Sequence, residues 1–168
     1  MGKDIEKWKV LDSTYLFQRP WLTARRDCVQ LPDGTIHNEY YVLEYPTWVN
    51  IIARTTAGQF VMVRQYRHGL GIVETELCAG VAEPGEDPET AARRELLEET
   101  GYSGGEWSLL TVLSPNPSSN NNLSYCFVAE GVELTDKQHL DATEDIAVLL
   151  MSRGEVEAML RSEDLKQG

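Results

Sequence analysis

The sequence lacks a long hydrophobic run. Nowhere in the 168 residues is there an apolar stretch of about 18 residues or more, the minimum for a membrane-spanning helix. The N-terminal segment, residues 1–8, also lacks the apolar centre of a secretory signal. We therefore expect a cytoplasmic protein that has no membrane partner.

Basic residues are also scarce. The chain has 15 Lys and Arg against 27 Asp and Glu, a formal net charge of -12. Nucleic-acid-binding surfaces cluster Lys and Arg to displace counterions from the phosphate backbone, so the balance of charge argues against a nucleic-acid partner. Any polyphosphate bound by so acidic a chain requires help from cations.

Cysteine and histidine are few and widely spaced. The chain has 3 of each. No CxxC pair is present, which argues against a zinc site, and the odd number of cysteines argues against a disulfide framework. We interpret the cysteines as reduced core residues and the histidines as surface or turn residues. They are Cys28, Cys78 and Cys126, and His37, His68 and His139.

Apolar residues make up 42% of the chain, enough to bury the core of one main domain with a small appendage. The first 46 residues have strand patterns and a strong turn signal at residues 32–34. They predict a small antiparallel β-sheet subdomain over residues 1–46.

The remainder, residues 47–168, predicts a main domain of strands and helices. Strand patterns cover 48–54, 60–66, 76–79, 107–113, 123–128 and 146–151. Helical patterns cover 88–100 and 152–161, and a proline-broken polar loop covers 114–122. The predicted fold class is α+β, with a mixed sheet flanked by helices.

Three glutamates on the first helix carry the strongest indication of chemistry. Glu95, Glu98 and Glu99 stand at i, i+3 and i+4, which places their carboxylates on one helix face. Such a triplet on its own is typical of a solvated surface. The alternative is a set of hard oxygen ligands for Mg²⁺ or Mn²⁺.

A fixed frame of residues around the triplet favours the metal site. The frame reads Gly80, five residues, Glu86, seven residues, Arg94-Glu95-Leu96, one residue, Glu98-Glu99, one residue, Gly101-Tyr102. At frequencies of ~7% each, its seven Gly, Glu and Arg positions recur by chance on the order of 10⁻⁸ per window.

This frame closely resembles the Nudix box of the Nudix hydrolases, apart from Tyr102, where the family usually has an aliphatic residue. The resemblance implies an α/β/α sandwich and hydrolysis of a nucleoside diphosphate linked to another group. It also implies Mg²⁺, with Mn²⁺ as an alternative, at Glu95, Glu98, Glu99 and the carbonyl of Ala79. Gly80 is expected to allow a tight turn, and Glu86 and Arg94 to brace the loop against the helix.

Residues before the box resemble the ADP-ribose pyrophosphatase branch, which acts on nucleoside diphosphate sugars. The similar segments are Val63-Arg64-Gln65-Tyr66-Arg67 and Glu76-Leu77-Cys78-Ala79-Gly80. In the second segment Cys78 replaces the usual proline. The resemblance assigns Arg67 and Glu76 to substrate phosphates or sugar hydroxyls, although a surface ion pair is an alternative interpretation of Arg67.

Two further regions are similar to this branch. Pro117 follows the box at the position where members that act on ADP-sugars carry a proline, although prolines also punctuate turns. Members use an N-terminal sheet for dimerisation, which implies a homodimer. Phe17 and Arg19, with Tyr15 and Trp21, are then candidates to contact the base, and ordinary sheet packing is the alternative.

The chain departs from its relatives near Asp141. They carry two acids there, one for metal and one as the base that activates water. Glu144 matches the first, whereas Ala142 falls on the second. The general base is therefore open between Asp141, Glu144, Glu98 and a metal-bound hydroxide.

These features predict Mg²⁺-dependent hydrolysis of ADP-ribose or a related nucleoside diphosphate sugar. Glu98, Glu99, Glu144 and Arg94 are the expected catalytic residues. One rival is a Nudix hydrolase of a dinucleoside polyphosphate or an oxidised nucleotide. Another is a sensor that binds a nucleotide sugar without turnover.

Overall fold

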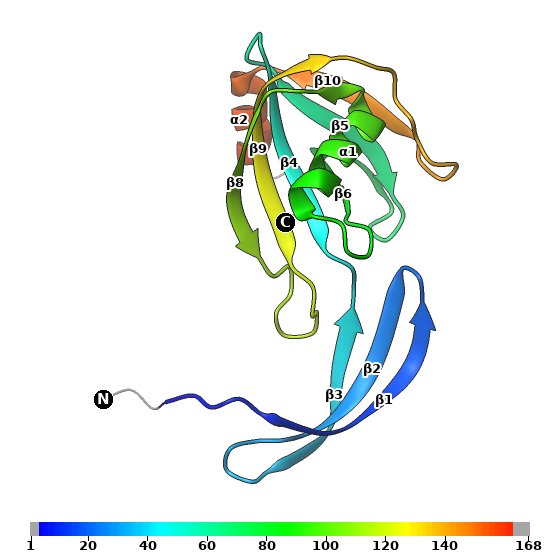
Figure 1. The fold of residues 1–168 in the computed structure, drawn as a ribbon, viewed down its shortest axis with the longest axis vertical. Helices are drawn as coiled ribbons and strands as arrows, with labels where there is room; N and C mark the ends of the chain where they lie inside the picture. The colour runs from blue at the N-terminus through cyan, green and yellow to red at the C-terminus, as the bar shows by residue number, and fades with distance from the viewer. Residues whose placement is uncertain (1–3, 163–168) are drawn as a thin grey trace. The chain divides into compact units, whose positions relative to one another are not determined.

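The computed structural model describes residues 4–162, and the chain forms two compact units (Figure 1). The first unit consists of Met1–Pro46 and Ser114–Asn122, and the second of Thr47–Leu113 and Leu123–Gly168. The chain therefore leaves the second unit once and returns to it. The ends of the predicted domains, residues 1–3 and 163–168, lie outside the described residues.

The first unit contains the small antiparallel sheet that the sequence predicts. Its strands are β1 (Lys9–Arg19), β2 (Leu22–Gln30) and β3 (Ile36–Glu44), in the order β1-β2-β3. In the turn between β2 and β3, Gly34 adopts a φ of 89°. The Asp33 carboxylate accepts the Thr35 N–H at 2.9 Å. The turn chemistry in the sequence therefore sets this hairpin.

The loop over residues 114–122 joins the first unit through backbone hydrogen bonds to β3. The N–H of Leu43 donates to Ser119 O at 2.8 Å, and the N–H of Asn121 donates to Leu43 O at 3.2 Å. The Tyr40 hydroxyl donates to the carbonyl of Ser118. A segment that the sequence predicts as a loop thus contributes to the first unit.

The described residues of the second unit form a mixed seven-stranded sheet with a helix on each face. Its order is β10-β5-β6-β4-β9-β7, with β8 paired to β9. β4 and β9 run parallel, whereas the other pairs are antiparallel. The strands are β4 (Trp48–Thr55), β5 (Phe60–Arg67), β6 (Ile72–Val81), β7 (Tyr102–Ser103), β8 (Glu106–Leu113), β9 (Ser124–Leu134) and β10 (Ile146–Met151). The helices are α1 (Pro88–Thr100) and α2 (Arg153–Arg161).

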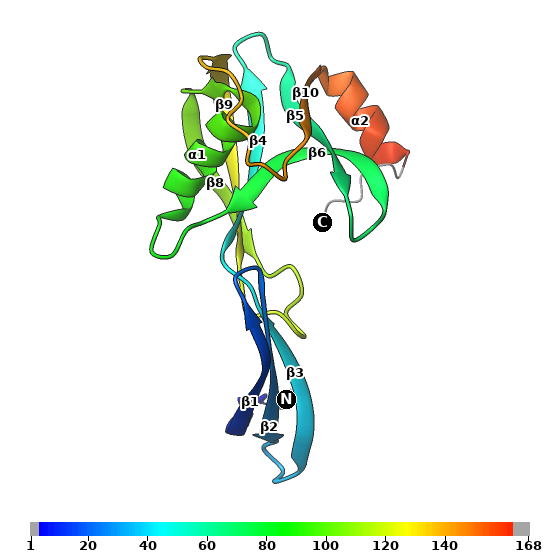
Figure 2. The same ribbon diagram turned by 90° about the vertical axis from the view of Figure 1, so that its right-hand side faces the viewer.

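The core lies between α1 and one face of this sheet (Figure 2). Leu96 and Ala92 of α1 are fully buried with Val49 and Ile51 of β4. Alternate residues such as Ile52 belong to the opposite face, where the sheet and α2 enclose an apolar cavity of about 440 Å³. The mixed fold with helices on both faces confirms the predicted class.

Two strands differ from the sequence prediction in length. β6 begins at Ile72, earlier than expected, and β9 continues to Leu134. The start of β6 is held by cross-strand pairing with β5, in which Glu74 lies opposite Gln65. Local strand patterns miss such segments because the stabilising partner is a separate strand.

In residues 4–162 no helix has the length and hydrophobicity needed to cross a bilayer.

Candidate active site

The helix α1 begins and ends at the residues that the sequence predicts. The Asp87 carboxylate caps the N-terminus by accepting the Thr90 N–H at 3.1 Å, and Pro88 occupies the first turn. At the other end, Gly101 has a left-handed φ of 77° and donates its N–H to Leu97 O at 2.8 Å. These caps fix the length of the helix that carries the glutamates.

The glutamate triplet faces the end of β6. Glu99 is only 5% exposed, and Glu95 and Glu98 are partly buried. Oε1 of Glu95 accepts the N–H of Val81, the last residue of β6, at 3.1 Å. The three carboxylates therefore do not form a solvated surface face.

Gly80 makes the close approach of α1 to β6 possible. A β-carbon at this position would overlap the Glu95 carboxylate. Gly80 lies within β6 and has no positive φ. The prediction of a tight turn at this glycine is therefore wrong. The box requires glycine here because the helix carboxylate occupies the space of a side chain.

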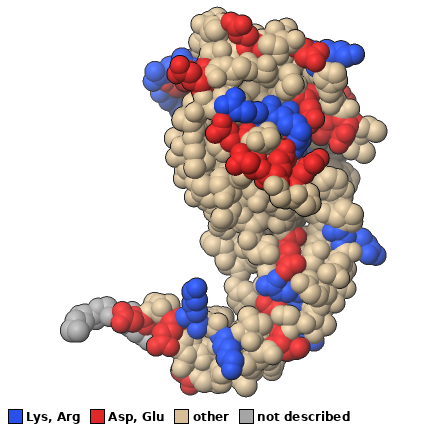
Figure 3. Space-filling model, in the orientation of Figure 1, with Lys and Arg blue, Asp and Glu red and all other residues tan. Residues whose placement is uncertain are grey.

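Arg94 connects the loop, the strand and the helix. Its guanidinium donates to both carboxylate oxygens of Glu86, at 3.1 and 2.9 Å, and to Val81 O at 3.0 Å. Its Nη1 also donates to Glu95 and Glu98, each at 3.0 Å. The hydrogen bonds from Arg94 lower the pKa of Glu86. The brace between Glu86 and Arg94 is as the sequence predicts, and around it Figure 3 shows acidic and basic side chains gathered over α1.

Glu99 is the most perturbed carboxylate of the cluster. Burial is the main cause that raises its pKa from 4.5 to about 7, and repulsion from Glu95 and Glu144 adds to the shift. Hydrogen bonds from the Cys78 thiol and the Ala79 N–H offset part of it. Burial also raises the pKa of Glu95. Such a site favours a bound cation, because positive charge stabilises the ionised carboxylates against both desolvation and mutual repulsion.

The donor set fits a hard divalent cation. Oε2 of Glu99 is buried and has no hydrogen-bond partner within residues 4–162. In the same part of the chain no three His, Cys, Asp or Glu side chains are already gathered as a coordination sphere. Arg94 instead hydrogen-bonds Glu95 and Glu98. A cation held by Glu95 and Glu98 would compete with Nη1 of Arg94 for their carboxylates.

The loop before β10 brings another acid near this cluster. Glu144 is exposed, and its Oε2 accepts the Asp141 N–H at 2.9 Å. Its charge still contributes to the raised pKa of Glu99. Ala142 offers no acid in this turn, so the general base stays open between the acids named from the sequence.

A cavity of about 610 Å³ adjoins the cluster through Ala79 and Gly80. Arg67 and Glu76 lie in its wall, and Arg67 Nε donates to Glu76 Oε1 at 2.8 Å. Glu76 is 2% exposed, whereas the Arg67 side chain is 42% exposed. The ion pair thus leaves part of the guanidinium open to solvent.

Several residues of this cavity escape the sequence prediction. Trp48, Asn50 and Ser124 line it, and Asn50 Nδ2 donates to Ser124 Oγ at 2.7 Å. They approach Gly80 only because β4 pairs with both β6 and β9. Glu74 also lines the cavity, and the sequence could have indicated it. It stands two residues before Glu76 and so shares its face of β6.

The remaining predicted substrate contacts, Phe17, Arg19 and Pro117, all belong to the first unit and are exposed. Arg19 Nη1 donates to the neighbouring Gln18 O at 2.9 Å. Their contact with substrate stays a prediction.

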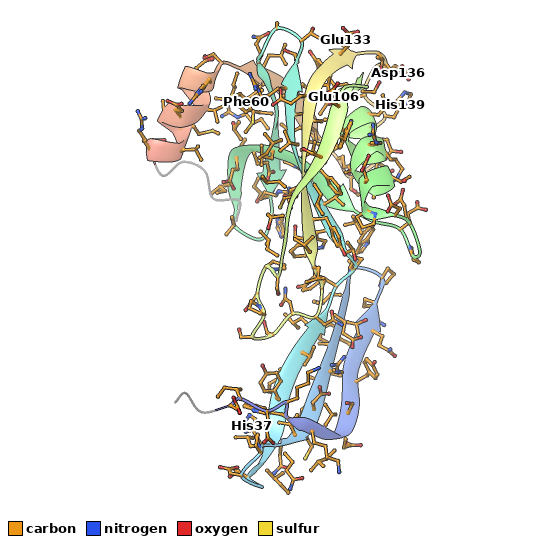
Figure 4. All side chains as sticks on the ribbon, turned by 60° about the vertical axis from the view of Figure 1, so that its left-hand side comes forward. His37, Phe60, Glu106, Glu133, Asp136 and His139 are labelled. Carbon is orange, nitrogen blue, oxygen red and sulfur yellow. The ribbon has the colours of Figure 1, made fainter. Side chains whose placement is uncertain are left out.

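The histidines are exposed, as expected. Figure 4 shows His139 beside Asp136, to which its Nε2 is hydrogen-bonded at 3.1 Å. The cysteines are free, but only Cys78 is fully buried.

In comparisons with known proteins, two protein-family models match the chain, each over a different part. The NUDIX domain model matches residues 44–167. The model of the nucleoside diphosphate sugar hydrolase N-terminal domain matches residues 8–43.

Curated relatives extend over most of the chain. An ADP-ribose pyrophosphatase of Bacillus subtilis is 31% identical over 88% of this chain and 79% of its own length. A methanol dehydrogenase activator of Bacillus methanolicus is 34% identical over 79% of this chain and 70% of its own length.

A solved structure shares the fold. A crystal structure of an ADP compounds hydrolase superposes with a TM-score of 0.84 at 22% identity, covering 99% of this chain and 89% of that one. Together with the domain match and the Glu95–Glu99 site on α1, these similarities show that the chain belongs to the Nudix hydrolase family.

Proposed function

We propose that the protein hydrolyses the pyrophosphate bond of ADP-ribose or a related nucleoside diphosphate sugar in a Mg²⁺-dependent reaction. The products are a nucleoside monophosphate and a sugar phosphate. The observation that carries this proposal is the buried Glu99 carboxylate with an open oxygen, next to a cavity walled by Arg67 and Glu76. The matched nucleoside diphosphate sugar hydrolase domain supports the substrate class.

Glu95, Glu98, Glu99, Glu144 and the carbonyl of Ala79 are the proposed ligands for Mg²⁺, which Mn²⁺ can replace. The cation supplies charge neutralisation at the phosphates and an acidified water. The chain itself supplies a rigid cradle, since Arg94 ties Glu86 to the carbonyl of Val81. Glu98 is the most exposed of the three proposed helix ligands, at 42% of its side chain, and is a candidate proton acceptor with Asp141 and Glu144.

The two ends of the Arg67–Glu76 pair suit different parts of a nucleotide sugar. The exposed part of the guanidinium can donate to a phosphate oxygen, which is the acceptor that its planar geometry fits best. The buried Glu76 carboxylate can accept hydrogen bonds from sugar hydroxyls. The pair therefore favours a substrate that joins a phosphate to a hydroxyl-rich group.

The first unit is the proposed dimerisation element. Every residue of β1 is exposed in the described structure, including Leu11, Leu16 and Phe17. Exposed apolar surface of this kind is typical of an interface, and we assign a second copy of the chain to it. Phe17, Arg19 and Pro117 are the proposed contacts to the nucleoside. Free cysteines suit the proposed cytoplasmic location, where thiols stay reduced.

The test is hydrolysis of a substrate panel with Mg²⁺. The panel contains ADP-ribose, other nucleoside diphosphate sugars, a dinucleoside polyphosphate and an oxidised nucleoside triphosphate, and chromatography separates the products. We expect a nucleoside monophosphate and a sugar phosphate from at least one nucleotide sugar. Preferred hydrolysis of another class would support a rival Nudix activity, and tight binding without turnover would support a sensor.

Two variants connect the activity to the site. Glu99→Gln should lower kcat by on the order of 100-fold or more, because a proposed metal ligand loses its charge. Glu89→Gln is the matched control, since Glu89 is on the same helix but pairs with Arg93 at the surface. Equal loss in both variants would contradict a specific role of Glu99.

A further inference from the structure

Cys78 lies where β6 passes beneath α1. It is fully buried in the core cluster that contains Leu96 and Ala92. Its thiol is within hydrogen-bonding reach of the Glu99 carboxylate. The contact thus joins a residue of the sheet to a proposed metal ligand of the helix.

The spacing of contacts along the helix and the strand supports this arrangement. Glu95 lies against Gly80, and Glu99, four residues later, lies against Cys78, two residues earlier. Four helical residues rise about 6 Å and two strand residues about 6.6 Å. The helix number rises as the strand number falls, so α1 and β6 run antiparallel. The matching rises allow both carboxylates to lie against the strand.

Glu99 itself indicates what the contact is for. The residue is 5% exposed, yet its Oε2 has no hydrogen-bond partner in the described part of the chain. A buried carboxylate oxygen without a partner is costly unless a cation occupies the space it faces. The carboxylate therefore has one side held by its protein neighbours and one side open.

We propose that Cys78 is a positioning residue whose S–H donates to Glu99 and orients the open oxygen toward the divalent cation. The inference rests on the proposed metal-dependent function. Partners behind a metal ligand of this kind commonly contribute to metal affinity.

The test is Mn²⁺ binding by the metal-free full-length protein, followed by the loss of the free-ion signal in electron paramagnetic resonance. Cys78→Ala and Cys78→Val remove the donor, and the valine also keeps most of the volume. We expect both to raise the Kd about 10-fold. Cys78→Ser keeps a donor and should bind within about 3-fold of the wild type, as a hydroxyl can replace the thiol.

Cys126→Ala is the control, because Cys126 lies on β9, which carries none of the proposed metal ligands. Circular dichroism verifies that each variant is folded. In a Glu99→Gln background, Cys78→Val should cause no further loss if Cys78 acts through Glu99. This comparison also tests whether Cys78 acts through Glu99 if the alanine variant does not fold.

Equal Mn²⁺ affinity in the wild type and Cys78→Val would overturn the role of Cys78 but leave the proposed metal site in place. Equally weak binding by the serine and valine variants would overturn it too, since a packing defect would then explain the loss. Failure of the wild type to bind Mn²⁺ would overturn the metal site and with it this inference.

Discussion

At the scale of single residues, the site depends on carboxylates that are hard to ionise without a cation. Glu99 has its pKa raised from 4.5 to about 7, chiefly by burial. In the metal-free protein the folded state therefore binds the proton more tightly than the unfolded state. The contribution of Glu99 to stability is fully present below about pH 4.5 and is lost as the pH rises through about 7.

We predict that chelator-treated protein loses about 3 kcal/mol of unfolding free energy from Glu99 between pH 4.5 and 8. Urea unfolding at several pH values measures the effect. Glu99→Gln cannot ionise, so its stability relative to the wild type should increase over this range. Parallel curves for the two proteins would show that Glu99 ionises normally.

Gly80 provides a second prediction at this scale. Gly80→Ala places a methyl group where the Glu95 carboxylate lies, so we expect a loss of about 1–3 kcal/mol in unfolding free energy. Gly154→Ala is the control, because a β-carbon at Gly154 in α2 meets no atom within 4 Å. It should stabilise by up to about 1 kcal/mol. Similar effects at the two glycines would argue against the close approach of α1.

The sequence predicts the local part of the site and misses the non-local part. The glutamates and the Glu86–Arg94 brace lie on one short segment, so helix periodicity and the box place them. Asn50 and Ser124 come together only through the pairing of β4 with β9. No spacing in the sequence indicates that pairing, because the two strands lie far apart along the chain.

At the scale of elements, α1 and α2 differ in how much they contribute to the buried core. Helix α1 buries Leu96 and Ala92 in the core. In the described structure none of the residues of α2 is buried, although Ser152 and Glu155 cap it reciprocally. The predicted boundaries of both helices are close to those observed, since caps and Gly101 are local signals. Strand β7 was not predicted, because it has only two residues and its strand pairing is with the distant end of the extended β9.

This difference predicts unequal effects of removing the caps. Asp87→Ala should lower the unfolding free energy by about 1 kcal/mol, because the N-terminus of α1 loses a hydrogen bond within the core-forming element. Ser152→Ala should change global unfolding less, since α2 can fray without exposing the core. Thermal unfolding measures both. A larger effect at Ser152 would mean that α2 contributes more to stability than its exposure indicates.

At the scale of the whole molecule, the two sheets differ in how their strands are covered. The main sheet has α1 over one face, whereas β1 in the first unit has only exposed residues. The sequence predicts both sheets from their strand patterns. It cannot predict that residues 114–122 join the first unit, because that loop carries only turn residues and its partner Leu43 is remote.

We predict a homodimer that depends on β1. Light scattering should give twice the mass of one chain for the wild type. Leu16→Glu should weaken the dimer, because it places a charge on exposed apolar surface of β1. Leu110→Glu serves as control, since Leu110 is 58% exposed but lies on β8 in the second unit. A monomeric wild type would contradict the proposal.

The return of residues 114–122 to the first unit has a consequence for protein synthesis. The N-terminal strands leave the ribosome first, but the Tyr45 N–H must wait for the Asn121 side chain, 76 residues later. At ~5–20 residues per second the delay is about 4–15 s. During that interval the nascent first unit lacks the backbone hydrogen bonds between Leu43 and residues 119 and 121, which leaves an open strand edge that could pair with another chain.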